Sequence, residues 1–154
     1  MEIGIYKATL ADMELLMEWR MRVLREVFAI SDGSDTAALE RKNREYYEQH
    51  LQNNSHTACF SKNTQTGKIV GCGGICYQEE MPSPDNLSGT CGYLMNIYTL
   101  PECRGMGVGQ KIVRFLIQDA QERGTGKIYL ESSKSAKRLY QSVGFTELQD
   151  YMKL

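Results

Sequence analysis

Three glycines at alternate positions follow Arg104, namely Gly105, Gly107 and Gly109, between a β-rich run and the most regular helical pattern. Glycine lets the backbone approach a ligand closely and adopt positive φ angles. The helix that follows offers free N–H groups and the positive end of its dipole, which together bind phosphate. Arg104 would add a charge-assisted donor. One glycine would suffice for a tight strand-to-helix turn, so three predict an anion-binding turn.

Two common nucleotide-binding motifs do not fit this turn. A Rossmann fingerprint, G-x-G-x-x-G, requires glycine where Gln110 stands. A P-loop, G-x-x-x-x-G-K-[ST], fails at the Gly126-Lys127 pair, because Gln121 occupies the first glycine position and Ile128 follows the lysine. The turn is therefore predicted to bind a phosphate-containing ligand by a motif other than the Rossmann fingerprint or the P-loop.

Hydrophobic periodicity predicts the elements that carry the turn. Alternating or continuous apolar runs indicate strands, and apolar residues spaced by three, four and seven indicate amphipathic helices. We expect strands at residues 3–6, 57–61, 68–77, 92–100 and 127–131, and a final strand or hairpin at 145–154. Helices are expected at residues 9–28, from 36 to about 52, at 108–122 and at 135–143. The order β-α-α-β-β-β-α-β-α-β indicates one α/β (α+β) domain over residues 1–154, with antiparallel hairpins in its middle.

The first two helices have recognisable ends and faces. Thr9 and Asp12 have the spacing of a capping box, which places the start of the first helix. The face that this helix should bury includes Leu24, Val27 and Phe28. The second helix is expected to bury four residues, Leu39, Tyr46, Tyr47 and Leu51.

Composition excludes several classes of protein. The chain has 18 Lys+Arg and 19 Asp+Glu, a net charge of −1, which argues against a nucleic-acid partner. No apolar run approaches the ~18–20 residues of a membrane span, and the N-terminus lacks a basic segment followed by an apolar one. We therefore expect a cytoplasmic protein with no membrane partner. Five cysteines without a C-x-x-C pair, and two histidines elsewhere, predict neither a disulfide framework nor a metal site.

The glycine turn and its surroundings resemble the Gcn5-related N-acetyltransferase (GNAT) superfamily. The superfamily signature, Arg/Gln-x-x-Gly-x-Gly/Ala, stands here as Arg104-Gly-Met-Gly-Val-Gly109. The strand and proline that precede it are Asn96-Ile-Tyr-Thr-Leu-Pro101. Behind it come the strand Ile128-Tyr-Leu-Glu131 and the Leu-Tyr-x-x-x-Gly-Phe segment, here Leu139–Phe145. The resemblance covers essentially the whole chain and implies a mixed, mostly antiparallel twisted sheet flanked by helices.

The resemblance also implies acetyl-CoA as cosubstrate. Its pyrophosphate would lie on the turn made by Arg104, Gly105, Met106, Gly107, Val108, Gly109 and Gln110, and its pantetheine arm along Ile97, Tyr98 and Thr99. Ser133 stands where many members carry an asparagine that contacts the cofactor. Local charge agrees with a phosphorylated ligand, because residues 104–138 carry a net +5, whereas residues 1–56 carry −3.

Acyl transfer to an amine needs a base, a stabilised oxyanion and a proton for the departing thiolate. By resemblance, Tyr140 is the proton donor and Glu131 the base, although a core tyrosine and a solvated strand-end carboxylate are alternative interpretations. The amine acceptor should meet the first two helices and the Pro82–Ser88 loop. A non-catalytic acyl-CoA-binding or sensing module is the alternative function. The sequence leaves open whether two chains form a homodimer.

Overall fold

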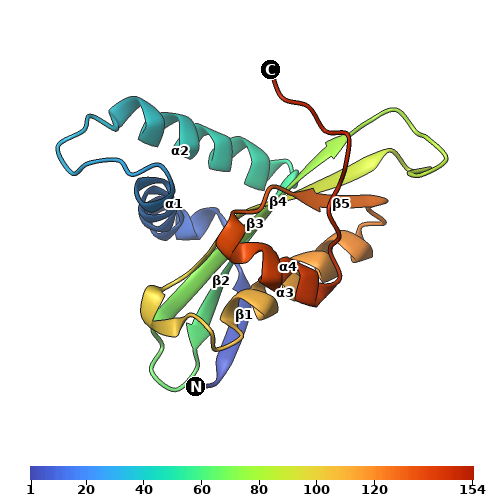
Figure 1. The fold of residues 1–154 in the computed structure, drawn as a ribbon. Helices are drawn as coiled ribbons and strands as arrows, with labels where there is room; N and C mark the ends of the chain where they lie inside the picture. The colour runs from blue at the N-terminus through green and yellow to red at the C-terminus, as the bar shows by residue number, and fades with distance from the viewer.

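The computed structural model describes residues 1–154 as a five-stranded sheet flanked by helices (Figure 1). The strands are β1 (Ile3–Lys7), β2 (His56–Asn63), β3 (Ile69–Glu79), β4 (Thr90–Thr99) and β5 (Lys127–Leu130). They are ordered β1-β2-β3-β4-β5 across the sheet. Neighbours are antiparallel except β4 and β5, which are parallel. The predicted mixed and mostly antiparallel sheet is therefore confirmed.

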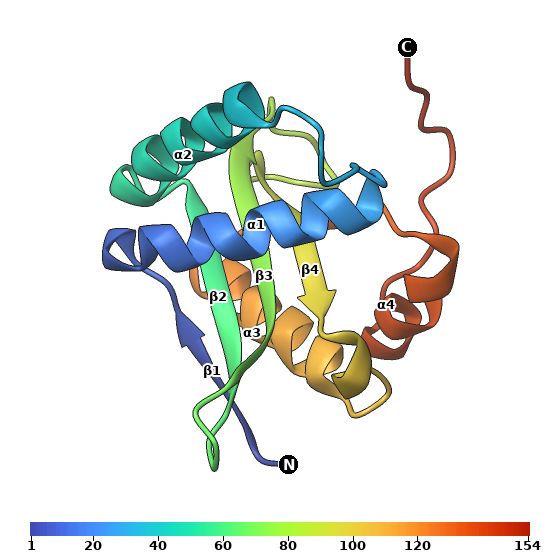
Figure 2. The same ribbon diagram turned by 90° about the vertical axis from the view of Figure 1, so that its left-hand side faces the viewer.

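Helices cover both faces of this sheet. They are α1 (Met13–Val27), α2 (Ala37–Gln52), α3 (Val108–Glu122) and α4 (Lys137–Val143). Figure 2 shows α1 crossing one face of the strands, with α3 behind them on the other face. Residues 56–61 of β2 are buried throughout because the two helical layers exclude water from both sides. Trp19 of α1 packs on Phe60 of β2, with ring centroids 6.2 Å apart.

The close approach of α3 to the sheet depends on a glycine in β3. A Cβ atom at Gly73 would lie 2.4 Å from Cγ2 of Ile112 and 3.0 Å from Cδ1 of Ile97. The first distance is far below van der Waals contact, so only glycine allows α3 to pack this closely. The first turn of α3 is thereby held at the end of β4, where the anion-binding turn was predicted.

A bulge in β4 opens the sheet on the β5 side. Two residues of β4, Asn96 and Ile97, face the single residue Gly73 of β3. Asn96 has φ 57°, in the left-handed region, and such bulges bend a strand and increase its twist. Pairing with β5 stops at Leu94, so the β5-facing edge of residues 95–99 has no strand partner.

Most predicted elements are confirmed, but the last one is not. Residues 145–154, which we call the tail, form neither a strand nor a hairpin. The N–H of Phe145 makes the last backbone hydrogen bond, to the carbonyl of Tyr140, and Asp150 has φ 66°, in the left-handed region. The tail therefore has strand-like composition without a pairing register, and the outer edge of β5 stays unpaired.

The predicted burial of the first two helices is only partly correct. The capping box of Thr9 and Asp12 is present. Val27 and Phe28, however, are 66% and 69% exposed, because the last turn of α1 extends beyond β4 (Figure 2). On α2 only Tyr47 is fully buried, whereas Leu39 lies at the surface and Tyr46 and Leu51 are half-buried.

No helix is both long and apolar enough to cross a membrane. All five cysteines are free, and no His, Cys, Asp or Glu cluster suits a metal ion.

Candidate active site

The glycine-rich turn joins β4 to α3 through two residues in the left-handed region. Gly105 has φ 77°, and Gly107, the N-cap of α3, has φ 79°. A Cβ atom at either glycine would meet nothing within 4 Å, so the backbone angle requires glycine here and the space above the turn is open. Gly109 differs, because its Cβ would lie 3.1 Å from Cδ2 of Leu139. That glycine allows α3 to pack closely against α4.

The turn presents a row of unpaired backbone donors. Lys111 is the first residue whose N–H bonds back into the helix, to the carbonyl of Gly107 at 3.2 Å. The N–H groups of residues 105–110 donate to no protein atom. Six consecutive free donors at a helix N-terminus, where the helix dipole is positive, form a strong site for a phosphate group.

Arg104 is engaged by protein atoms on the opposite side of the turn. Its Nε donates to the carbonyl of Thr99 at 3.0 Å, and its Nη2 lies 2.9 Å from Oε1 of Glu26 on α1. Oε2 of the same carboxylate accepts a hydrogen bond from the Tyr98 hydroxyl at 2.6 Å. These two donors hold the pKa of Glu26 below its usual range. Arg104 thus fastens the turn to α1, and a direct phosphate contact stays a prediction.

The open edge of β4 runs towards the turn. Tyr98 and Thr99 pair with β3 on one side, Ile97 belongs to the bulge, and none of the three has a strand on the other side. The Tyr98 side chain is buried against Trp19, with ring centroids 6.1 Å apart, so only the main chain of this residue is available to a ligand. An extended pantetheine-like chain would find there the free hydrogen-bonding edge that a sixth strand would use.

Four predicted cofactor residues differ in what their side chains do. Met106 is 61% exposed at the tip of the turn, whereas Val108 is buried beneath it. Nε2 of Gln110 donates to the Ser142 hydroxyl at 2.7 Å, which connects α3 to α4. Ser133 is exposed after β5, and its hydroxyl lies 3.2 Å from that of Ser135. The Ser133 hydroxyl thus makes no hydrogen bond to the turn.

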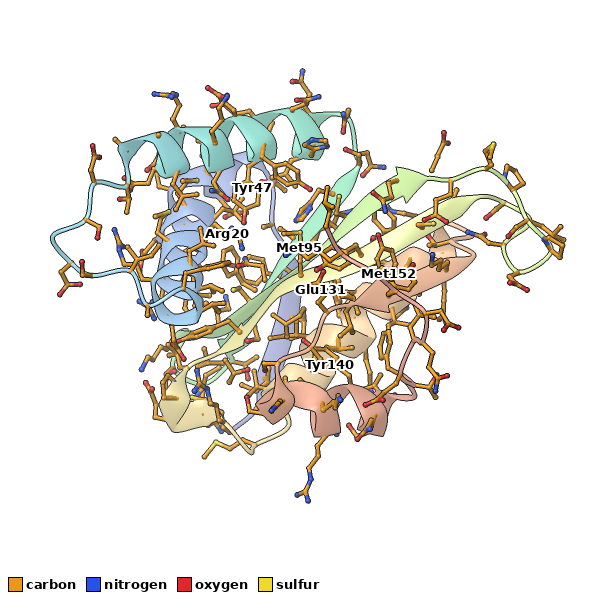
Figure 3. The ribbon with its side chains drawn as sticks, turned by 45° about the horizontal axis from the view of Figure 1, so that its top comes forward. Arg20, Tyr47, Met95, Glu131, Tyr140 and Met152 are labelled. Atoms are coloured by element: carbon orange, nitrogen blue, oxygen red, sulfur yellow. The ribbon has the colours of Figure 1, made fainter.

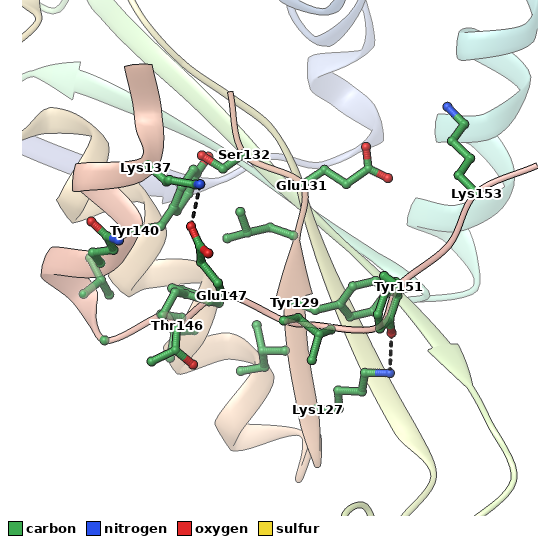
Figure 4. Close-up of a pocket in the computed structure, with 18 of the residues that line it drawn as sticks. Lys127, Tyr129, Glu131, Ser132, Lys137, Tyr140, Thr146, Glu147, Tyr151 and Lys153 are labelled. Atoms are coloured by element: carbon green, nitrogen blue, oxygen red, sulfur yellow. Dashed lines mark hydrogen bonds and ion pairs between the residues drawn. The ribbon is translucent and has the colours of Figure 1, made fainter. Parts of the chain in front are cut away.

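Tyr140 is held by α4 with its hydroxyl free of protein partners. The residue is 9% exposed, its ring packs edge-on against Phe145 at 6.0 Å, and Gly144 ends the helix with φ 112°. Burial, and then the neighbouring Tyr93, raise the pKa of Tyr140, so its hydroxyl is protonated at neutral pH. Tyr140 also lines a groove of about 1070 Å³ between β5, α4 and the tail (Figure 4).

Glu131 lies immediately after β5 and is exposed. Figure 4 shows its carboxylate extending away from Tyr140 and from the Lys137–Glu147 ion pair. Burial raises the pKa of Tyr93, and the Glu131 carboxylate adds to that rise, so the two groups lie near one another. Tyr93, a residue outside the predicted site, thus lies near both predicted catalytic residues. Nothing in the local sequence marks Tyr93 as a site residue, because its pairing with Tyr129 of β5 becomes visible only in the fold.

A second residue missed from the sequence is Arg20, on α1. Its Nε donates to Oδ1 of Asn43 on α2 at 2.9 Å, and its Nη1 donates to Oδ1 of Asn96 at 3.1 Å. Asn96 is a bulge residue of β4, so Arg20 connects α1 and α2 to the point where the sheet opens. Figure 3 shows Arg20 between these helices and the sheet. Nothing in the local sequence around Arg20 distinguishes it from other surface arginines.

Residues 104–138, the basic segment, hold eight Lys+Arg, but only part of this charge is free of carboxylate partners. Four of its eight cations are in ion pairs with carboxylates, namely Arg104, Arg123, Lys127 and Lys137. These pairs reduce the local field, and the three at the surface contribute little to stability, whereas the Arg123–Asp119 pair is largely buried. The remaining cations, Lys111, Arg114, Lys134 and Arg138, are exposed and have no carboxylate within 4.0 Å.

Comparisons with known proteins find N-acetyltransferases. The chain is 35% identical over 88 residues to the uncharacterized N-acetyltransferase YjgM of Escherichia coli, covering 55% of this chain and 48% of that protein. It is 27% identical over 89 residues to the glucosamine 6-phosphate N-acetyltransferase of Trypanosoma brucei brucei, covering 58% of each. The matches thus span about half the length of these curated relatives.

A solved structure matches nearly the whole chain. The predicted acetyltransferase from Clostridium acetobutylicum, determined with acetyl-CoA, superposes with a TM-score of 0.86 at 27% identity, covering 99% of this chain and 96% of the other. The family model described as "Acetyltransferase (GNAT) family" matches residues 15–145. With the signature on an open turn at the end of a bulged β4, the chain belongs to the GNAT acetyltransferase family.

Proposed function

We propose that the protein transfers an acetyl group from acetyl-CoA to a primary amine of a small molecule or peptide. The observation that carries this proposal is the row of free N–H groups at residues 105–110, set at the end of the open β4 edge. The two features together suit a pyrophosphate joined to an extended polar chain, as in coenzyme A. The Clostridium acetobutylicum structure with acetyl-CoA supports the same assignment.

In this proposal the ligand is held mainly by main-chain groups. The pyrophosphate accepts hydrogen bonds from the turn, and the pantetheine amides pair with residues 97–99. The thioester then lies where β4 and β5 separate, beside the bulge at Asn96. A main-chain N–H of β4 near Tyr98 stabilises the negative charge that develops on the carbonyl oxygen.

The transfer itself is a direct attack on the thioester. The neutral amine nitrogen bonds to the carbonyl carbon, the carbon–sulfur bond breaks, and the electron pair leaves with sulfur. Glu131 takes the proton that the amine nitrogen loses, directly or through water, and Tyr140 gives its hydroxyl proton to the thiolate. The raised pKa of Tyr140 keeps that proton in place until the thiolate forms.

A non-catalytic acyl-CoA-binding module is the second candidate. The observation in its favour is that the Glu131 side chain extends away from Tyr140 (Figure 4). Such a module would use the same turn and β4 edge, but it would bind acetyl-CoA without turnover on any amine.

Release of free thiol from acetyl-CoA, measured against a panel of primary amines, separates the two candidates. For an enzyme, we expect Tyr140→Phe to lower kcat about a hundredfold, within the range of general acid catalysis, while the Kd for acetyl-CoA is unchanged. Tyr151→Phe is the matched control, because Tyr151 lines the same groove but is 61% exposed on the tail. Binding of acetyl-CoA with no thiol release on any amine would favour the module.

A further inference from the structure

Arg20 is the partly buried arginine whose charge has no carboxylate partner. Of the four arginines that are neither buried nor fully exposed, Arg22, Arg44 and Arg123 each form an ion pair, with Glu18, Glu14 and Asp119. No carboxylate lies within 4.0 Å of Arg20, and both of its hydrogen-bond partners are neutral amides. A cation in such surroundings is costly unless an anion accompanies it.

The guanidinium of Arg20 is nevertheless firmly positioned. Asn43, which accepts from its Nε, is itself fixed because its Nδ2 donates to the carbonyl of Leu39 at 2.9 Å. Asn96 fixes Nη1 from β4. Nη2 donates to no protein atom, which leaves part of the planar fork free for a carboxylate or phosphate oxygen.

The charge of Arg20 acts on the face of the sheet that carries α1 and α2. Burial raises the pKa of Tyr46 and of Tyr47 on α2, and the Arg20 guanidinium opposes that rise at both residues. The same guanidinium is hydrogen-bonded to Asn96, so its charge lies next to the bulge of β4.

Glu131 belongs to the same face. Tyr93 of β4 stands opposite Cys76 of β3, whose thiol neighbours Tyr46 of α2, so both side chains are on the face that carries α1 and α2. The Tyr129 ring packs on that of Tyr93 at 5.1 Å, and Glu131 follows Tyr129 by two residues, which keeps it on the same face because side chains alternate along a strand. In the view of Figure 3, Met95 lies between Arg20 and Glu131. A cation and a carboxylate thus face the same region of the sheet at the point where β4 and β5 separate.

We infer that Arg20 binds an anionic group of the acceptor, a carboxylate or a phosphate, while the acceptor amine lies towards Glu131 and the thioester. This inference rests on the proposed function and specifies its substrate class as an amine that carries an anion. Arg20 supplies the positive charge for the anion, and Glu131 takes the one proton that the neutral amine nitrogen loses on acylation. Arg20 is therefore a specificity-determining residue and takes no part in proton transfer.

Matched acceptors that differ only in the anion test the inference. We would measure kcat/KM for glucosamine 6-phosphate against glucosamine, and for L-amino acids against their amides. In at least one of the two series, the wild type should prefer the anionic member by tenfold or more. Arg20→Gln should remove this preference, Arg20→Lys should keep part of it, and Arg25→Gln, which removes an exposed charge from the same helix, should leave it unchanged.

The ratio separates recognition from structural damage. Since each ratio is compared between wild type and variant, differences in intrinsic amine reactivity cancel, and a misfolded variant would lose activity on both members alike. A preference confined to phosphates or to carboxylates identifies the anion. Equal rates on both members in both series, or a preference that survives Arg20→Gln, would overturn the inference.

Calorimetric titration in the presence of CoA compares the affinities of the same anionic and neutral acceptors without requiring turnover. If the chain releases no thiol on any amine, the proposed function fails. Tighter binding of the anionic member by wild type, lost in Arg20→Gln, would still support the role of Arg20, and equal binding would contradict it.

Discussion

The proposed cofactor side of the candidate site is made of main-chain groups, whereas its proposed acceptor side is made of side chains from three elements. The turn at residues 105–110 offers N–H groups that any sequence with glycine at the correct positions can supply. The acceptor side depends on Arg20 from α1, Asn43 from α2 and Asn96 from β4. Substitutions at Arg20, Asn43 or Asn96 can thus change the acceptor without changing the cofactor, because none of these side chains is needed to form the turn.

The largest expected effect is on the cofactor side, at Gly107. Gly107→Glu places a carboxylate among the free N–H groups and forces a non-glycine residue into φ 79°. We expect the Kd for acetyl-CoA, measured by calorimetry, to rise at least a hundredfold.

Gly124→Glu is the matched control for this substitution. Gly124 also has a positive φ, 72°, and open space around it, but it lies at the opposite end of α3. It should carry the same backbone strain without affecting acetyl-CoA binding. Equal Kd values for the two variants would mean that the turn does not hold the phosphate.

His56, buried between α2 and β2 on the proposed acceptor side, should make the free energy of unfolding depend on pH. His56 is 4% exposed, its Nδ1 lies 2.9 Å from the Tyr46 hydroxyl of α2, and burial lowers its pKa to about 4. The unfolded chain therefore binds a proton more readily than the folded chain. Stability is full above the unfolded pKa of ~6.5 and falls as the pH drops towards 4.

Urea unfolding measures this loss directly. Between pH 7 and pH 5 we expect the free energy of unfolding to fall by roughly 2 kcal/mol from this residue, at 1.36 kcal/mol for each pH unit below the unfolded pKa. His56→Gln should flatten the profile, whereas His50→Gln, at a partly exposed histidine, should keep it steep. A profile equally steep in His56→Gln would assign the pH dependence to other groups.

The smallest effect concerns the connection between the two sides, at Glu26. Its carboxylate holds both Arg104 and Tyr98, so Glu26→Gln weakens the ordering of the turn against α1. Half-exposed ion pairs are worth ~1 kcal/mol or less, so the Kd for acetyl-CoA should rise about three- to fivefold.

The sign of the Glu26 effect tests the role of Arg104. If Arg104 bound phosphate directly, its release from Glu26 would tighten acetyl-CoA binding instead of weakening it. Glu18→Gln, which breaks the exposed i,i+4 pair with Arg22 on the same helix, should not change the Kd.

The contrast between the two sides also explains what sequence could predict. The turn, α3 and the Tyr140 segment are local, because each depends on residues close together in the chain. Arg20 meets partners 23 and 76 residues away, and its lack of a carboxylate becomes visible only once the fold is assembled. The bulge at Asn96 lies inside a run that reads as a regular strand, so pattern alone gave no sign of it.

At the tail and at the end of α1, the sequence instead predicts structure that the fold does not form. Residues 145–154 have the composition of a strand, but strand formation requires a partner register that composition does not supply. Val27 and Phe28 continue the apolar periodicity of α1 past the edge of the sheet, where there is nothing for them to cover. Periodicity indicates which side of an element is apolar, and the length of the neighbouring layer decides how much of that side is buried.

Asn96 has a consequence for how two ligands would influence each other. The same residue interrupts the pairing of β4 beside the edge that we propose for pantetheine, and it holds the guanidinium of Arg20. A ligand that stiffens β4 reduces the entropy lost when Arg20 is ordered by a second ligand. We therefore expect CoA and an anionic acceptor to bind with positive cooperativity. Thermodynamic linkage requires each to raise the affinity for the other by the same factor.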